Sequence, residues 1–230
     1  MEHTITALKV QKRNPQRVNV YLDGEFAFGV ARIVAAWLEI GRQISDEKIA
    51  QLKDEDGREV AYQIALRFLS YRPRTAAEIR TQLEKKGISE NDCEFVLERL
   101  KNSGLIDDAR FADMWVENRT DLRPRGRRAL AYELRRRGVS DKHIQQSLED
   151  IDEDEIAYQA ACKQFRKYRS LEWDDFRKKM YAHLARRGFS YATSAEATAR
   201  VWAEQRDGVS GREANLGNPT TDNEEVNDEW

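Results

Sequence analysis

The chain is poor in the residues that mark several protein classes. Its 230 residues include two cysteines, Cys93 and Cys162, which exclude a disulfide framework and favour a reducing compartment. No run of 18 apolar residues occurs, and the first 30 residues lack the apolar core of a secretory signal. The three histidines, His3, His143 and His183, have no cysteine or carboxylate at metal-ligand spacing. These absences predict a cytoplasmic protein with no membrane contact and no metal.

Motifs for catalysis are also missing. The sequence contains neither a phosphate-binding loop of the G-x-x-x-x-G-K-[ST] type nor a dinucleotide fingerprint. Two acidic pairs, Asp107-Asp108 and Asp174-Asp175, stand at predicted helix starts, where carboxylates stabilise free backbone N–H groups. Cys93 falls on the apolar stripe of its helix, so we expect it to be buried and inert. The sequence therefore predicts no enzymatic activity and no cofactor.

Charge is abundant but uneven. Lys and Arg number 39, Asp and Glu number 41, and charged residues make up 35% of the chain. Residues 57–206 carry 30 basic and 25 acidic side chains, whereas residues 207–230 carry one basic side chain and seven acidic ones. That last segment has almost no periodic apolar residues, so it cannot bury enough surface to offset its ordering entropy. We expect a disordered acidic tail over 207–230.

Arginine is concentrated between positions 119 and 137. The basic residues there are Arg119, Arg123, Arg125, Arg127, Arg128, Arg135, Arg136 and Arg137, opposed by Asp121 and Glu133 alone. The planar guanidinium fork suits carboxylates and phosphates, and it is weakly hydrated, which favours interfaces. Two interpretations stay open: a binding surface, or an ordinary solvated helix face.

A repeat of about 50 residues organises the middle of the chain. Gly87, Gly138 and Gly188 are 51 and 50 residues apart, and a leucine stands four positions before each. Each glycine follows a basic pair: Lys85-Lys86, Arg136-Arg137 and Arg186-Arg187. The basic pairs fit helix C-capping, and they also fit a stripe of charge along one side of a repeat array.

Each repeat unit reads as three helices. In the first unit, an apolar stripe at Val60, Ile64 and Phe68 marks one helix, and Thr75 begins a second. The predicted fold class is mainly α, with tandem three-helix modules over 57–107, 108–152 and 153–206. A module of this size buries little surface alone, so we expect the modules to stack into an elongated, curved array.

The N-terminal segment, residues 1–56, shows strand alternation instead. Apolar residues alternate through Ile5–Val10 and Val18–Leu22, and Asp23-Gly24 is a strong two-residue hairpin signal. We expect a small antiparallel sheet of three strands, followed by short helices over Ala31–Leu38 and Asp46–Leu52.

These residues resemble those of a known family. Ala65–Thr75, followed by Glu78-Ile79, Leu83 and Gly87, is similar to the opening module of the RecX family of bacterial recombination regulators. Gly104–Ala112 resembles the family's link between its first and second modules, and Gly126 with Glu133–Val139 resembles the second module. The likeness covers about residues 57–205 and is weakest in the third module.

The resemblance implies a non-enzymatic modulator of RecA. Such a protein would bind along the groove of the RecA filament on single-stranded DNA and restrain ATP hydrolysis, strand exchange and co-protease activity. We expect a monomer, with possible direct contact to DNA phosphates. The alternative is a helix-turn-helix-like protein that binds DNA directly, although a net charge of +5 over 57–206 is weak for that role.

Charge and repeat position select the candidate binding residues. They are Arg74, Lys85, Lys86, Arg123, Arg125, Arg127, Arg128, Arg135, Arg136, Arg137, Arg186 and Arg187.

Overall fold

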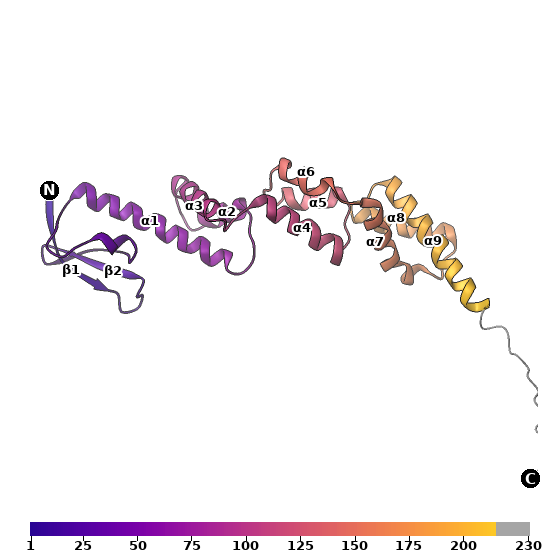
Figure 1. The fold of residues 1–230 in the computed structure, drawn as a ribbon, viewed down its shortest axis with the longest axis horizontal. Coiled ribbons are helices and arrows are strands. Elements are labelled where there is room, and N and C mark those ends of the chain that lie inside the picture. Colours follow the sequence, from indigo (N-terminus) through magenta and orange to yellow (C-terminus); the bar gives the residue numbers. More distant parts are fainter. Residues whose placement is uncertain (215–230) are drawn as a thin grey trace, which may run out of the picture. The chain divides into compact units, whose positions relative to one another are not determined.

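Helices dominate the computed structural model, which describes the backbone of residues 1–214 and the side chains of residues 1–204. The described elements are β1 (Glu2–Val10), β2 (Arg17–Leu22), β3 (Glu25–Ala31), η1 (Val34–Trp37, a 3-10 turn), β4 (Gln43–Ser45), α1 (Asp46–Leu69), α2 (Ala76–Glu84), α3 (Glu90–Asn102), α4 (Asp108–Leu122), α5 (Arg127–Arg135), α6 (Asp141–Glu149), α7 (Glu153–Tyr168), α8 (Trp173–Arg186) and α9 (Tyr191–Ala214) (Figure 1). The mainly α architecture with tandem helix triplets, preceded by an antiparallel sheet, is confirmed.

The chain divides into two compact units. Unit 1 comprises Met1–Ala112 and Arg135–His143, and unit 2 comprises Asp113–Leu134 and the residues from Ile144 onward. The predicted domain limits at 57, 108 and 153 stay a prediction. The backbone of α9 is described to Ala214. The remainder of the predicted acidic tail, residues 215–230, lies outside the described residues.

The N-terminal sheet has one strand more than expected. Its order is β3-β2-β1-β4, with every neighbour antiparallel. The hairpin between β2 and β3 turns at Asp23 and Gly24, both at positive φ, as the Asp-Gly signal predicts. The fourth strand, β4, pairs with the first residues of β1. Three residues are too few to show strand alternation, so β4 could not be predicted from the sequence pattern.

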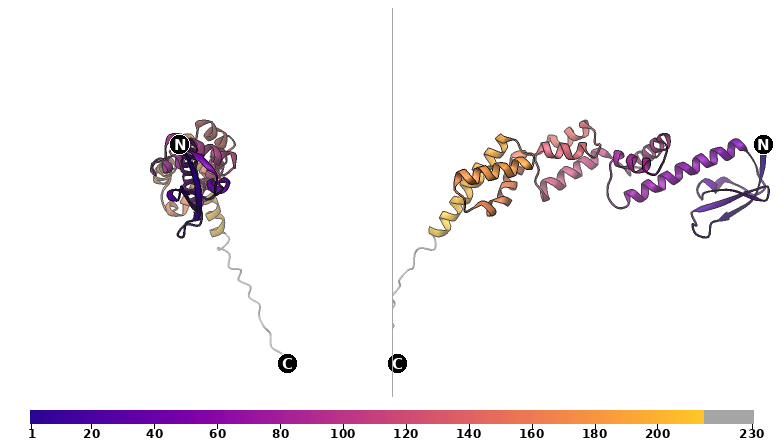
Figure 2. Two further views of the ribbon diagram at one scale, coloured as in Figure 1. Left: turned by 90° about the vertical axis from the view of Figure 1, so that its left-hand side faces the viewer. Right: turned by 180° about the vertical axis from the view of Figure 1, so that it is seen from behind.

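One long helix, α1, takes the place of two expected elements. These are the short helix at Asp46–Leu52 and the separate helix with the apolar stripe at Val60, Ile64 and Phe68. Helix α1 continues through Gly57, where glycine costs about 1 kcal/mol relative to alanine. Contacts to the sheet offset that loss: the Asp56 carboxylate accepts hydrogen bonds from the Ala31 amide (2.6 Å) and the Arg17 guanidinium (2.8 Å). The sheet thus lies beside the N-terminal half of α1, as two views of the ribbon show (Figure 2). The other expected helix, at Ala31–Leu38, is reduced to the single turn η1.

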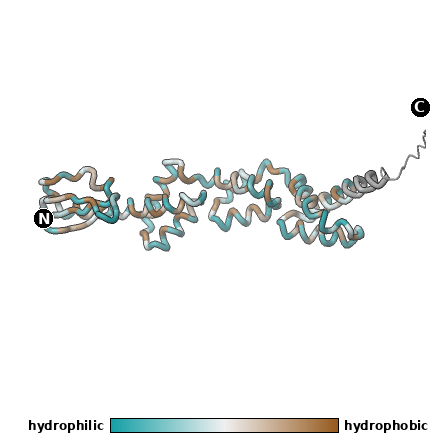
Figure 3. Tube along the Cα trace, turned by 90° about the horizontal axis from the view of Figure 1, so that it is seen from below, coloured by the Kyte–Doolittle hydropathy of each residue, from teal (hydrophilic) through white to brown (hydrophobic). Residues whose placement is uncertain are grey.

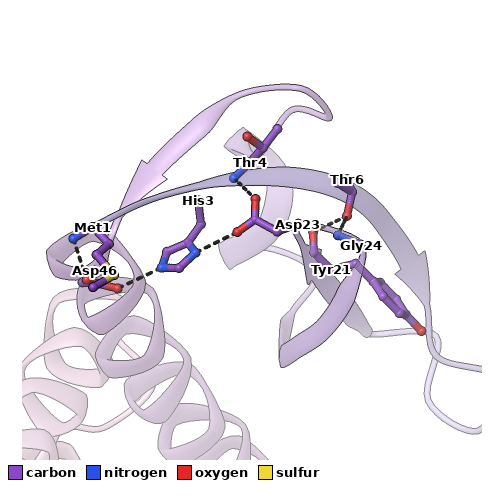
Figure 4. Close-up of polar contacts among 8 residues, drawn as sticks. All are labelled: Met1, His3, Thr4, Thr6, Tyr21, Asp23, Gly24 and Asp46. Atoms are coloured by element: carbon purple, nitrogen blue, oxygen red, sulfur yellow. Dashed lines mark hydrogen bonds and ion pairs between the residues drawn. The ribbon is translucent and has the colours of Figure 1, made fainter.

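A histidine ties this sheet to α1 (Figure 4). His3 on β1 contacts Asp23 of the hairpin through Nδ1 (2.8 Å) and Asp46 at the start of α1 through Nε2 (3.2 Å). The hydrogen bond to Asp23, with further help from Asp46, raises the pKa of His3 above its ordinary 6.5. Both carboxylates are distant in sequence, so local spacing could not predict these partners.

Repeated sequence signals make repeated helix ends. Thr75 accepts a hydrogen bond from a backbone amide in the first turn of α2, which confirms it as an N-cap, and Ser89 caps α3 in the same way. Gly87, Gly138 and Gly188 end their helices at φ of 77°, 77° and 88°, a region that glycine enters without strain.

The acidic pairs also stand at helix starts, as expected. Asp107 accepts from the amides of Ala109 and Arg110 at the start of α4. Asp108 accepts instead from the amide of Ala76, the first residue of α2 (2.9 Å).

The apolar side chains form separate small cores. One lies between α1, α2 and α3, where Ile79, Leu83 and Cys93 are fully buried. Another lies between α7, α8 and α9 around Phe176 and Met180. Apolar residues alternate with polar ones along the chain (Figure 3), and no helix in the described part is long and apolar enough to cross a membrane.

His183 on α8 is half-buried, and one of its ring nitrogens is buried without compensation. Among the described residues, its Nε2 has no hydrogen-bond partner. Burial, followed by the charges of Arg187, Arg186 and Lys167, lowers the pKa of His183 from 6.5 to about 4. As the pH falls, His183 is therefore protonated in the unfolded chain at a higher pH than in the folded chain. Its contribution to stability is complete above pH 6.5 and is lost as the pH falls toward 4.

We predict that His183→Gln weakens the pH dependence of unit 2 stability. Between pH 7.5 and 5, the free energy of unfolding of the unchanged chain should fall by about 1 kcal/mol more than that of the variant, after allowance for solvent screening. Chemical denaturation followed by tryptophan fluorescence measures this difference. His3→Gln is the contrasting control, because a raised pKa stabilises toward low pH. Equal pH dependence in His183→Gln and the unchanged chain would contradict the prediction.

Candidate functional site

Two similar backbone junctions position the basic residues. In unit 1 the Thr75 hydroxyl donates to the carbonyl of Arg137 (2.6 Å) while it accepts from the Glu78 amide (3.1 Å). Next to it, Gly138 lies so close to Ala77 that a Cβ on Gly138 would overlap the Ala77 methyl group. The C-terminal end of α5 is thereby fixed against the first turn of α2.

The same arrangement recurs in unit 2. The amide of Gly126 donates to the carbonyl of Arg187 (2.9 Å), and the Arg187 guanidinium donates to the carbonyl of Pro124 (3.0 Å). A Cβ on Gly126 would stand 2.5 Å from the carbonyl oxygen of Gly188, and one on Gly188 would meet Ala129. Gly126 and Thr75 are 51 residues apart, and Arg187 and Arg137 are 50 apart. The second arginine of each pair is thus part of a junction.

We predict that Gly126→Ala destabilises unit 2 by about 1–3 kcal/mol, because the Cβ meets backbone atoms that cannot rotate away. Gly57→Ala in the exposed middle of α1 is the matched control, since its Cβ would meet nothing within 4 Å. That control should gain about 0.5–1 kcal/mol. Urea denaturation measures both changes, and a neutral Gly126→Ala would contradict the junction geometry.

A basic groove lies beside the first junction. This cavity of about 450 Å³ is lined by Phe68, Arg74, Ala77, Glu78, Thr81, Gln82, Lys85, Arg135, Arg136, Arg137 and Gly138. Five of the predicted binding residues, Arg74, Lys85, Arg135, Arg136 and Arg137, therefore meet at one place in unit 1. Among these described lining residues, Glu78 is the one carboxylate. We call this cavity the basic groove.

The carboxylate in the groove is already engaged. Glu78 accepts two hydrogen bonds from Arg72 (3.0 and 3.1 Å) and one from Arg137 (2.7 Å). Burial acts to raise the pKa of Glu78, but Arg72 and Arg137 hold it below its ordinary value. Arg135 pairs with Asp141 at 2.7 Å. Glu78 therefore bonds to Arg72 and Arg137, and its charge also acts on Arg74 without a hydrogen bond to it.

Arg74 is held in the groove wall. Its guanidinium stacks on the Phe68 ring at 3.9 Å from the centroid. In the described part of the chain, its buried Nε has no hydrogen-bond partner. Burial, then the nearby charge of Arg72, lowers the pKa of the Arg74 guanidinium. A positive charge in this position favours the arrival of an anion.

The other predicted binding residues have different surroundings. Lys86 is exposed in unit 1 and does not line the groove. In unit 2, Arg125 pairs with Glu133 (3.1 Å), and Arg127 donates to the carbonyl of Ile151 (2.7 Å). Exposed side chains without a recorded polar contact to the described residues are Arg123, Arg128 and Arg186. They are available to a partner.

Sequence reasoning missed the polar and aromatic lining. Phe68 was assigned to a helix stripe and Glu78 to a cap, and neither Thr81 nor Gln82 was singled out. The repeat is the sequence signal that points to Gln82. Gln82 stands 51 residues before Glu133, so the first repeat has an amide where the second has a carboxylate.

Four family models match successive parts of the chain. Residues 3–45 match the regulatory protein RecX N-terminal domain. The first, second and third three-helix domains of RecX match residues 61–100, 107–148 and 152–206.

Named relatives agree with these matches. The regulatory protein RecX of Leuconostoc mesenteroides subsp. mesenteroides is 31% identical over 210 residues, which cover 89% of this chain and 78% of the relative. The regulatory protein RecX of Clostridium perfringens strain SM101 is 33% identical over 194 residues, covering 81% and 91%.

Solved structures share the fold. A crystal structure of regulatory protein RecX superposes with a TM-score of 0.71 at 30% identity and covers 83% of this chain and 96% of its own. RecX from Lactobacillus salivarius gives 0.59 at 23% identity, covering 64% and 97%, and shows likeness of fold alone.

Proposed function

The chain belongs to the RecX family of regulatory proteins, and we propose that it binds the RecA filament on single-stranded DNA and restrains RecA. In this proposal it acts in the cytoplasm as a monomer without catalysis. It inhibits RecA ATP hydrolysis, and with it strand exchange and co-protease activity.

The observation that carries the proposal is the basic groove of a RecX-family chain. Its five basic side chains face one engaged carboxylate, so the surface carries excess positive charge. A RecA filament on DNA is a polyanion, and complementary charge accelerates association and fixes the register of binding. Arginine forks suit both partners of such a filament, because they bind protein carboxylates and backbone phosphates alike.

Lys85→Glu combined with Arg136→Glu should abolish most of the inhibition of RecA ATP hydrolysis. The double variant turns two attractive charges into repulsive ones on the groove, and we expect at least a tenfold rise in the concentration needed for half-inhibition. The measurement is ATP hydrolysis by RecA on single-stranded DNA, titrated with purified protein.

The matched control carries the same charge change on the turn between β1 and β2. Lys12→Glu with Arg13→Glu replaces two exposed basic residues and should inhibit like the unchanged chain. Undiminished inhibition by a folded groove variant would exclude the groove from the mechanism. Absence of inhibition by the unchanged chain would reject the proposed function itself.

A further inference from the structure

Equivalent arginines of the first and second repeats have different ion-pair partners. Arg125 in unit 2 is 51 residues after Arg74, and both follow an Arg-Pro sequence. Arg125 is neutralised within its own unit by Glu133 at 3.1 Å. Glu133 also accepts from Arg119 (3.1 Å) and from the Trp115 indole (2.9 Å). The second repeat thus supplies its own counter-charge.

The first repeat lacks a carboxylate at that position; its carboxylate is Glu78, where the second repeat has Ala129. Gln82 occupies the position of Glu133, and Phe68 occupies that of Arg119. Arg74 consequently lies on an aromatic ring with its Nε unpartnered among the described residues, while Gln82 contributes a neutral amide to the same groove. The two repeats therefore differ in charge at this position.

The remaining charges in the groove do not restore the balance. Glu78 is shared between Arg72 and Arg137, and Asp141 pairs with Arg135. Arg74 and Lys85 are left beside these pairs. This local excess of positive charge favours an anion from outside.

We propose that the basic groove is the seat of a nucleic-acid backbone phosphate, with Arg74 as its central ligand. The inference rests on the proposed function for the filament as partner, and it assigns this groove to the DNA strand and not to RecA. A phosphodiester chain suits the groove because it carries closely spaced negative charges, and basic side chains that bind it release its condensed counterions. The planar fork of Arg74 matches a phosphate with two oxygens.

Gln82→Glu is the sharpest test, because it gives the first repeat the carboxylate that the second already has. The new side chain would neutralise Arg74 as Glu133 neutralises Arg125. We expect binding of a fluorescent 20-nucleotide oligo(dT), measured by anisotropy without RecA, to weaken about tenfold. The slope of log K against log salt should shrink by about 1.

The matched control is Gln146→Glu, the same change at an exposed position of α6. It should bind oligo(dT) like the unchanged chain. Arg74→Gln removes the charge without adding one and should weaken binding in the same direction. Circular dichroism and thermal unfolding confirm that each variant is folded, and Arg74→Lys separates loss of the fork from loss of the fold.

Each result of the oligo(dT) binding experiment either supports or overturns the phosphate seat. Weakened binding by Gln82→Glu and Arg74→Gln, with binding kept in Gln146→Glu, supports the phosphate seat. Unchanged oligo(dT) binding by folded Gln82→Glu overturns it. Preferential binding of a poly-glutamate peptide, lost in Gln82→Glu, also overturns it and assigns the groove to an acidic protein surface.

The same proteins separate this inference from the proposed function. If the unchanged chain binds oligo(dT) through Arg74 but does not inhibit RecA ATP hydrolysis, the proposed function fails and the phosphate seat stands. If Gln82→Glu inhibits RecA fully and binds oligo(dT) like the unchanged chain, the seat fails and the regulator stands.

Discussion

Close backbone approach at the arginine-glycine pairs is the constraint on which the rest depends. At Gly138 and Gly188 the chain must adopt positive φ, and it must also lie against the first turn of another helix, where no Cβ fits. One residue type meets both demands. The hydrogen bonds to the carbonyls of Arg137 and Arg187 then lock each junction. In unit 1 this contact forms the basic groove, because it brings the end of α5 to the start of α2.

The junctions give the two residues of each basic pair different surroundings. Arg137 and Arg187 are half-buried and bond to groups across the junction, so their replacement would change stability as well as charge. Arg136 and Arg186, one position earlier, are exposed. Capping and binding were alternative interpretations of the pair in the sequence. In the structure the second arginine of each pair bonds across the junction, and a binding role for the exposed first arginine stays a prediction.

The sequence predicted those features that depend on local chemistry. Helix starts at Thr75 and Ser89, helix ends at the glycines, and the Asp23-Gly24 hairpin all follow from rules that operate over a few residues. Features set by distant partners could not be predicted. The short strand β4 exists because β1 lies beside it, and α1 passes through Gly57 because Asp56 bonds to the sheet. Likewise, five of the twelve predicted binding residues meet in one groove only because Gly138 brings residues 135–137 to α2.

Two neighbouring positions of the repeat differ in how far their residue type varies. Leu83, Leu134 and Leu184 are each fully buried at equivalent positions, and any loss of their volume would open a cavity in a small core. The residue immediately before each leucine differs among the three repeats: it is Gln82, Glu133 or His183. The core therefore fixes the helix, while the neighbouring position sets local charge without altering the packing. Glu133 pairs with Arg119 and Arg125 of its own repeat, whereas Gln82 adds no negative charge to the first repeat.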